Sequence, residues 1–104
     1  MRLEARGFDV TIAGSGEHAL RSLREQPADV VVLDIRLPGM DGIRTLVKIK
    51  EEHPETQVIM VTGFADSDML AEVQRRGAFT YLMKPVDIGE LLEQIRQANQ
   101  SKTS

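Results

Sequence analysis

The fold is decided by the stretch VVVLDIRLPGMDG, which occupies residues 30–42. It opens on four apolar residues, and such an unbroken run predicts a strand that is buried on both faces of a parallel sheet. Asp34 is the polar residue that follows this run. The Pro-Gly pair further along predicts a loop, and Asp41 is the expected cap of a helix over residues 42–52.

The same order, a strand and then a helix, is repeated on both sides of this stretch. Strand patterns of apolar residues cover residues 8–12, 58–61 and 79–83. Helical spacing of apolar residues follows them at residues 15–25, 68–76 and 88–98. Strands that alternate with helices predict an α/β fold, in which a parallel sheet is covered by helices on both faces.

The first residues predict an incomplete beginning of this pattern. The sequence LEARG at residues 3–7 is typical of the end of a helix, with Gly7 as its terminator. A helix end in front of the strand at residues 8–12 implies that an earlier strand and part of a helix are lacking. We therefore expect a sheet without its first strand.

The composition indicates one ordinary globular domain. The chain has 104 residues, of which 41% are hydrophobic and 28% charged, and this length is too short for two domains with separate cores. We expect the domain to span residues 1–98, followed by a polar tail at residues 99–104. The formal net charge of −3 argues against nucleic acid as a direct partner, and the short apolar runs argue against a membrane span. The lack of cysteine is compatible with the reducing cytoplasm, where we expect the protein to act.

Three polar residues are placed at the carboxyl ends of predicted strands. They are Asp34, Thr62 and Lys84. Ligands of open parallel sheets bind beyond these strand ends, so the three side chains are expected at one edge. An acid, a hydroxyl and an ammonium group there favour the transfer of a small anion, with the acid as nucleophile and the ammonium group neutralising charge.

Three segments carry a resemblance to a known family. Residues 30–42 resemble the phosphoacceptor segment of response-regulator receiver domains, and VTG at residues 61–63 resembles their switch-hydroxyl segment. YLMKP at residues 81–85 resembles their segment from an aromatic residue to a lysine. The segments occur in the family's order and spacing, and the resemblance covers residues 8–98. It implies a flavodoxin-like fold and a role in two-component phosphorelay signalling.

The resemblance also implies a role for each matching residue at the phosphoryl group. Asp34 would accept the phosphoryl group from a sensor histidine kinase, and Lys84 would contact one of its oxygens. The backbone N–H groups of Ile35 and Gly63 would help to cradle those oxygens. Pro85 resembles the family's cis-proline, which aims the lysine.

Two further residues resemble the family's switch. Thr62 would move towards the phosphoryl group, and Tyr81 would rotate inward. In the unphosphorylated protein we expect Asp34 to pair with Lys84.

The metal site of the family is the part that this sequence lacks. In the family, Mg²⁺ is held by a pair of acids at the end of the first strand, beside the phosphoacceptor. Here only Asp34 and the backbone carbonyl of Arg36 match metal ligands, and they are weak without a second acid. Because phosphoryl transfer rests on positioning and charge neutralisation, we expect weak or absent Mg²⁺ binding and impaired phosphorylation.

Two functions follow from these patterns, and neither is that of an enzyme. The first is a receiver module that is phosphorylated at Asp34, with impaired efficiency. The alternative is a protein-interaction module that keeps the receiver fold and acts without phosphorylation. We also expect a homo-oligomer, because a lost inner strand would leave its two neighbours unpaired unless the gap closes or another chain fills it.

Overall fold

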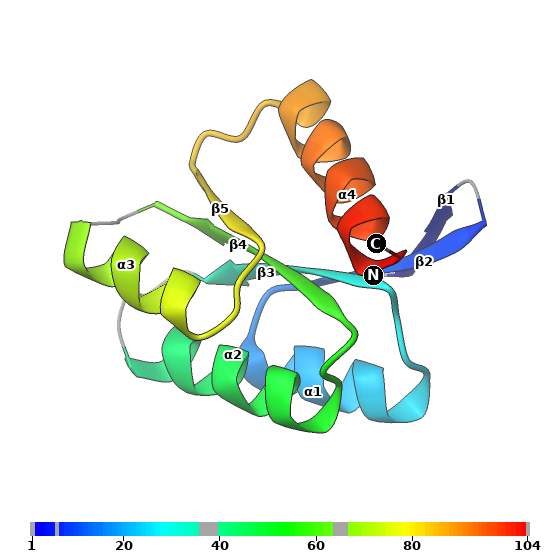
Figure 1. Cartoon of the computed structure of the whole chain (residues 1–104), viewed down its shortest axis with the longest axis horizontal. Helices are drawn as coiled ribbons and strands as arrows, with labels where there is room; N and C mark the ends of the chain where they lie inside the picture. The colour runs from blue at the N-terminus through cyan, green and yellow to red at the C-terminus, as the bar shows by residue number, and fades with distance from the viewer. Residues whose placement is uncertain (1, 6, 36–39, 64–66, 104) are drawn as a thin grey trace.

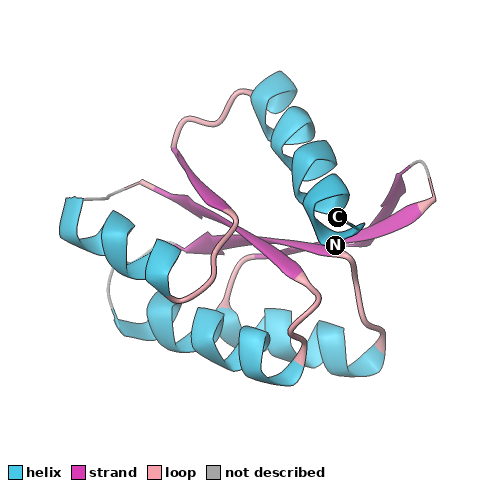
Figure 2. Cartoon of the chain, in the orientation of Figure 1, coloured by secondary structure: helices cyan, strands magenta, loops and turns pink. Residues whose placement is uncertain are grey.

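The computed structural model describes the backbone of residues 2–5, 7–35, 40–63 and 67–103. Within these residues, five strands form one sheet: β1 Arg2–Ala5, β2 Phe8–Ala13, β3 Val30–Ile35, β4 Gln57–Thr62 and β5 Thr80–Met83. The helices are α1 Gly16–Glu25, α2 Met40–Glu52, α3 Ser67–Arg75 and α4 Ile88–Thr103. Figure 2 shows helices on both sides of this sheet.

The predicted α/β architecture is confirmed. The strands β2, β3, β4 and β5 are adjacent in chain order and run parallel, and a helix follows each of them. The central strand β3 is buried from Val30 to Leu33, as its unbroken apolar run predicted.

The expected helix end near the start of the chain was wrong. Arg2–Ala5 is a strand, β1, that pairs antiparallel with β2, and Ala5 lies opposite Phe8. Two residues therefore connect the strands, and one of them is Gly7, with a φ of 88°. A glycine with positive φ ends helices and also forms tight hairpin turns, so the sequence LEARG fits both structures.

The gap expected inside the sheet is closed within the chain. In the flavodoxin-like order another strand lies between the counterparts of β2 and β3. Here β2 and β3 pair directly, with Val10 opposite Val30 and Ala13 opposite Leu33. Direct pairing satisfies the backbone N–H and C=O groups of both strands, so these groups do not require a second chain.

The two faces of the sheet are covered differently. On one face, which we call the α2 face, the strands pack against the buried residues of α1, α2 and α3. On the opposite face, the α4 face, the core side chains that come from a described helix belong to α4. Figure 1 shows this asymmetry, with α4 lying apart from the other helices across the sheet.

The helix ends show which boundaries the sequence could predict. Ser15 caps α1 as expected, because its hydroxyl oxygen accepts a hydrogen bond from the His18 N–H at 3.1 Å. Asp41 is not a cap, since α2 already begins at Met40. The helix α4 continues to Thr103, through most of the residues expected as a tail. No helix in the described ranges is long and apolar enough to cross a membrane.

Candidate functional site

The register of the sheet brings the three predicted strand ends to one edge. Ile35 at the end of β3 lies opposite Thr62 at the end of β4, and Thr62 lies opposite Met83 at the end of β5. Lys84 follows directly, and its backbone N–H donates a hydrogen bond of 2.8 Å to the Thr62 carbonyl oxygen. The parallel pairing therefore places residues from three separate segments beside one another.

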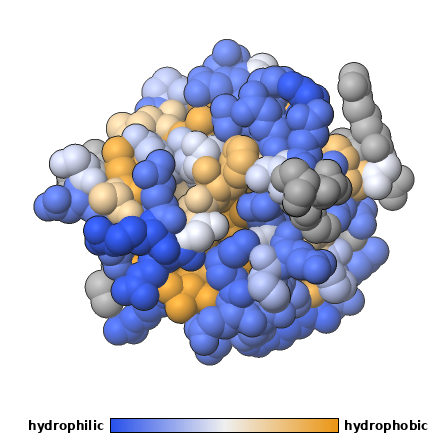
Figure 3. Space-filling view, in the orientation of Figure 1, coloured by the Kyte–Doolittle hydropathy of each residue, from blue (hydrophilic) through white to orange (hydrophobic). Residues whose placement is uncertain are grey.

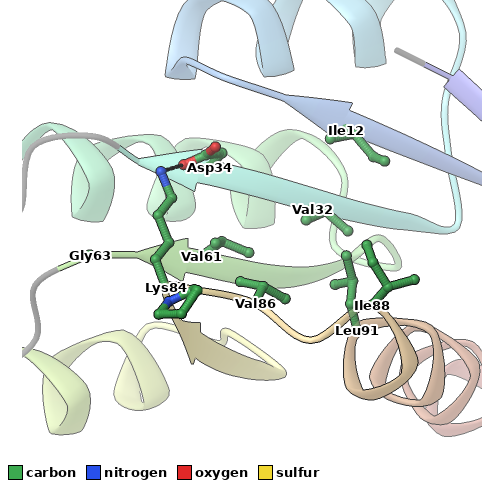
Figure 4. A pocket seen from close by; sticks show the side chains of 10 residues that line it. Ile12, Val32, Asp34, Val61, Gly63, Lys84, Val86, Ile88 and Leu91 are labelled. Carbon is green, nitrogen blue, oxygen red and sulfur yellow. Dashed lines mark ion pairs between the residues drawn. The ribbon is translucent and has the colours of Figure 1, made fainter.

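Asp34 and Lys84 form an ion pair at this edge. The Asp34 Oδ1 and Lys84 Nζ atoms are 2.7 Å apart, which confirms the expected pairing (Figure 4). Oδ1 is screened from water, and it accepts no well-directed hydrogen bond from the residues that the structure describes, so its contact with Lys84 is electrostatic in character. The side chains of Lys84 and Asp34 remain 39% and 38% exposed, so a reagent can reach the carboxylate. A pair this exposed contributes little to the stability of the fold.

Lys84 has Gly63 and Pro85 as its neighbours at this edge. The peptide bond between Lys84 and Pro85 is cis. A Cβ atom added at Gly63 would have Lys84 Cδ as its nearest neighbour, at 4.0 Å, so the lysine side chain passes close to this glycine. Gly63 and Pro85 thus flank the lysine that reaches the carboxylate.

Thr62 and Tyr81 lie on the other face of the sheet. Along each strand the side chains alternate, and both residues share the parity of strand residues that pack on the α2 face. Thr62 is buried, and Tyr81 is half-buried against the core of that face. The structure therefore divides the predicted residues into Asp34 with Lys84 on the α4 face, and Thr62 with Tyr81 on the α2 face.

Two of the three residues with a predicted backbone role at the phosphoryl or metal site lie within the described residues, and both are at this edge. Ile35 is the last residue of β3, and Gly63 directly follows β4. Arg36, whose carbonyl oxygen was the predicted metal ligand, lies outside the described residues.

The described side chains around Asp34 provide no cluster of acidic ligands for Mg²⁺. Mg²⁺ is held by carboxylate oxygens and waters in octahedral geometry. In the described part of the chain, no three His, Cys, Asp or Glu side chains lie close enough to hold a metal ion. The charged partner of Asp34 is an ammonium group, which repels a cation.

Sequence reasoning missed an apolar groove that ends at the ion pair. It has a volume of about 700 Å³ and runs from Asp34 and Lys84 along the α4 face. Its floor is formed by Ile12, Val32 and Val61, and its wall by Val86, Ile88 and Leu91 (Figure 4). In the space-filling view, hydrophobic residues reach the surface near the middle of the molecule, among mostly hydrophilic residues (Figure 3).

A signal for this groove was present in the final helix. The helical spacing of apolar residues there predicts one stripe made of Ile88, Leu91, Leu92 and Ile95. In the structure Leu91 and Ile95 pack on the sheet. Ile88 and Leu92 remain 66% and 57% exposed. The stripe is therefore wider than its contact with the sheet requires.

Comparison with known proteins agrees with this geometry. The sequence matches the response regulator receiver domain over residues 1–96. It is 40% identical to the DNA-binding transcriptional regulator NtrC of Klebsiella pneumoniae over 96 residues, which are 92% of this chain and 20% of that protein. It is 38% identical to the transcriptional regulatory protein ZraR of Escherichia coli K12 over 88% of this chain and 21% of that protein. The chain thus spans about one fifth of the length of these curated relatives.

Solved structures show the same fold. A CheY-like receiver domain protein from Methanospirillum hungatei JF-1 superposes with a TM-score of 0.80 at 24% identity, over 90% of this chain and 94% of that one. The beryllofluoride-activated NtrC4 receiver domain, which was solved as a dimer, superposes with a TM-score of 0.79 at 23% identity, over 89% of this chain and 97% of that one. The family match over nearly the whole chain, and the acid and lysine paired at the carboxyl edge of a parallel sheet, lead to one conclusion: the chain belongs to the response regulator receiver domain family.

Proposed function

We propose that the chain is a receiver module of two-component signalling in which Asp34 is the phosphoacceptor and phosphorylation is impaired. The observation that carries the proposal is the ion pair of 2.7 Å between Asp34 and Lys84 at the carboxyl edge of the sheet. The carboxylate is accessible to a donor, and the ammonium group beside it is placed to neutralise a transferred anion. This is a signalling module rather than an enzyme, because the group it receives stays on its own side chain.

The proposed reaction forms one bond and breaks one bond. A carboxylate oxygen of Asp34 attacks the phosphorus atom of a phosphohistidine on a sensor histidine kinase. The bond between phosphorus and the imidazole nitrogen breaks, the electron pair returns to that nitrogen, and an acyl phosphate remains on Asp34. Lys84 then contacts a phosphoryl oxygen, and the backbone N–H groups of Ile35 and Gly63 are proposed to bind the other oxygens.

The proposed impairment follows from the charges around Asp34. In the family a magnesium ion supplies additional positive charge at the acceptor. Among the described residues that line the groove at this edge, Asp34 is the one carboxylate and Lys84 is its charged neighbour, so we propose weak or absent Mg²⁺ binding, with or without the carbonyl of Arg36. Transfer then depends on Lys84 and the backbone donors alone, which lowers its rate.

The proposed switch residues connect this edge to the opposite face. Thr62 is hydrogen-bonded through its backbone to Lys84, and its side chain lies on the same face as that of Tyr81. We propose that a phosphoryl group on Asp34 draws the Thr62 hydroxyl towards the edge and lets Tyr81 move into the space. Pro85 is proposed to keep Lys84 aimed at the phosphoryl group throughout.

A second candidate function is protein interaction that does not require phosphorylation. The apolar groove on the α4 face favours it, because a groove with an apolar floor and wall suits a protein partner better than water. In this function the chain is proposed to bind proteins, including a second copy of itself, in the cytoplasm. We propose no direct contact with nucleic acid, because the net charge is −3 and the relatives named as DNA-binding are about five times longer than the part matched here.

Intact mass spectrometry after incubation with a small acyl phosphate and Mg²⁺ tests the proposal. We expect a minor fraction of the protein to gain the mass of one phosphoryl group, and Asp34→Ala to remove that fraction. The control variant Asp68→Ala changes an exposed aspartate in the first turn of α3 and should leave the fraction unchanged. Complete phosphorylation that depends on Asp34 would contradict the impairment, and modification that persists in Asp34→Ala would contradict the choice of acceptor.

A further inference from the structure

Lys50, near the end of α2, differs from an ordinary surface lysine in its partners. Its Nζ atom donates hydrogen bonds of 3.0 Å to the Pro54 carbonyl oxygen and of 2.9 Å to the Thr56 carbonyl oxygen. Among the residues that the structure describes, no carboxylate pairs with it. Two neutral acceptors therefore hold its amine, whereas Lys84 has the carboxylate of Asp34 as its partner.

The side chain of Lys50 is held at its stem and at its tip. A Cβ atom added at Gly77 would have Lys50 Cγ and Cε as neighbours at 3.4 Å, so the stem packs on the turn that follows α3. At the tip, Thr56 is itself fixed, because it is buried and its hydroxyl donates a hydrogen bond of 2.8 Å to the Ala28 carbonyl oxygen. The amine is therefore kept in one place by segments that are apart in the sequence.

The two carbonyl acceptors match the two N–H donors of a neutral amine. An ammonium group has three N–H donors, and the third donor of Lys50 has no acceptor in the described part of the chain. When this proton leaves, both hydrogen bonds can remain, and the lone pair takes the position of the third N–H. Burial also lowers the pKa of Lys50 below its ordinary value of 10.5, because it disfavours the charged form.

We propose that Lys50 is a nucleophile that takes an acyl group from a small acyl phosphate. The neutral Nζ atom attacks the carbonyl carbon of the donor, and the bond between that carbon and the bridging oxygen breaks. Phosphate leaves with the electron pair, Nζ gives one proton to water, and an amide remains on the side chain. A small donor is required, because Lys50 is half-buried and its amine lies against the backbone of residues 54–56.

This site is separate from the proposed phosphoacceptor. Lys50 contacts Thr56, which directly precedes β4, whereas Asp34 lies near the opposite ends of the parallel strands. An acyl phosphate has two electrophilic atoms, and the proposed function uses its phosphorus atom at Asp34, whereas Lys50 uses its carbon atom. The two products differ in mass, so the failure of one reaction leaves the other to be judged by itself.

Acylation would weaken the contacts that hold this corner of the fold. The amide has one N–H donor and no charge, so it cannot serve the carbonyl oxygens of both Pro54 and Thr56. We therefore expect acylated protein to unfold at a lower temperature than unmodified protein. Lys50→Arg, treated with the same donor, controls for acylation elsewhere in the chain. An equal loss in Lys50→Arg would contradict this consequence.

Peptide mapping after incubation of the whole chain with acetyl phosphate is the test. A protease that cleaves after aspartate and glutamate releases residues 42–51, which contain both Lys50 and Lys48. Lys48 is the matched control, because it is exposed on the same helix and is read from the same peptide by its fragment ions. At low conversion we expect several-fold more acetyl groups on Lys50 than on Lys48, in the unaltered protein and in Asp34→Ala alike.

Two further arms show whether the fold and the size of the donor cause this preference. In guanidinium chloride, which unfolds the chain, we expect Lys50 and Lys48 to react equally. With a bulky acetyl thioester in place of acetyl phosphate, we expect the preference for Lys50 to be lost. The proposal is overturned if Lys48 reacts as fast as Lys50 in the folded protein, if the preference persists after unfolding, or if the bulky thioester also selects Lys50.

Discussion

Two buried threonines show that the effect of a buried hydroxyl group on stability depends on its hydrogen-bond partner. The Thr56 hydroxyl donates a buried hydrogen bond of 2.8 Å to the carbonyl oxygen of Ala28. The Thr11 hydroxyl is fully buried in β2 and has no hydrogen-bond partner among the residues that the structure describes. A buried polar group without a partner costs free energy that an apolar group of the same shape avoids.

Replacing each threonine by valine should therefore change stability in opposite directions. We expect Thr11→Val to raise the free energy of unfolding by about 1 kcal/mol, because it removes an unsatisfied hydroxyl. Thr56→Val is the matched control and should lower it by about 1–2 kcal/mol, because it leaves the Ala28 carbonyl unsatisfied. Urea denaturation of both variants measures these differences. A loss of stability in Thr11→Val as large as in Thr56→Val would show that the Thr11 hydroxyl has a partner after all.

Single residues also show how far the site could be predicted. Asp34 and Lys84 each follow a parallel strand, and strand ends meet at one edge, so their pairing was predictable from order alone. Gly7 could not show whether residues 2–5 form a helix end or a strand, because a glycine with positive φ occurs in helix ends and in hairpin turns. Which of the two structures forms depends on whether residues 2–5 pair with another strand, and this pairing is a tertiary contact that local sequence does not reveal.

At the scale of elements, the close contact between α1 and α2 depends on a glycine. Gly16 is the first residue of α1, and a Cβ atom added there would collide with the Thr45 side chain of α2. The two helices are also joined by Arg24 and Glu52, whose atoms Nε and Oε1 are 3.1 Å apart. The hydrogen bond from Arg24 keeps the pKa of Glu52 below its ordinary value of 4.5. The glycine sets the helix spacing at one end, and the ion pair joins the helices elsewhere.

Adding a methyl group at Gly16 should push these helices apart. We expect Gly16→Ala to lower the free energy of unfolding by about 1–3 kcal/mol, because overpacking forces side chains or backbone to shift. Gly89→Ala is the control, since its Cβ would meet only Asp87 oxygens at 3.7 Å or more, and it should be neutral or stabilising by up to about 1 kcal/mol. Adding Thr45→Ala to Gly16→Ala should restore part of the loss. Equal effects of the two glycine variants would contradict the close contact.

At the scale of the whole molecule, the order of elements could be predicted from the sequence, whereas the closure of the sheet could not. Alternating strand and helix patterns determine a parallel sheet, because each helix must return the chain to the same edge. The direct pairing of β2 with β3 and the hairpin with β1 depend on which strand finds an unpaired neighbour. The spacing of apolar residues along the sequence does not show which strands pair. The groove on the α4 face follows from the same arrangement, because α4 is the helix of the described part of the chain that packs on this face of the five-stranded sheet.

The central proposal for the whole molecule is a receiver fold in which Asp34, the proposed phosphoacceptor, is paired with Lys84 and binds Mg²⁺ weakly or not at all. The most direct measurement is an NMR titration of the ¹⁵N-labelled protein with MgCl₂, with the amide of Gly63 as the probe beside Lys84. We predict small shifts that do not saturate at millimolar Mg²⁺ and that are the same in Asp34→Asn, because no cluster of three ligating side chains is found among the described residues and Asp34 is paired with an ammonium group. A saturating shift of Gly63 at millimolar Mg²⁺ that is lost in Asp34→Asn would contradict the claim.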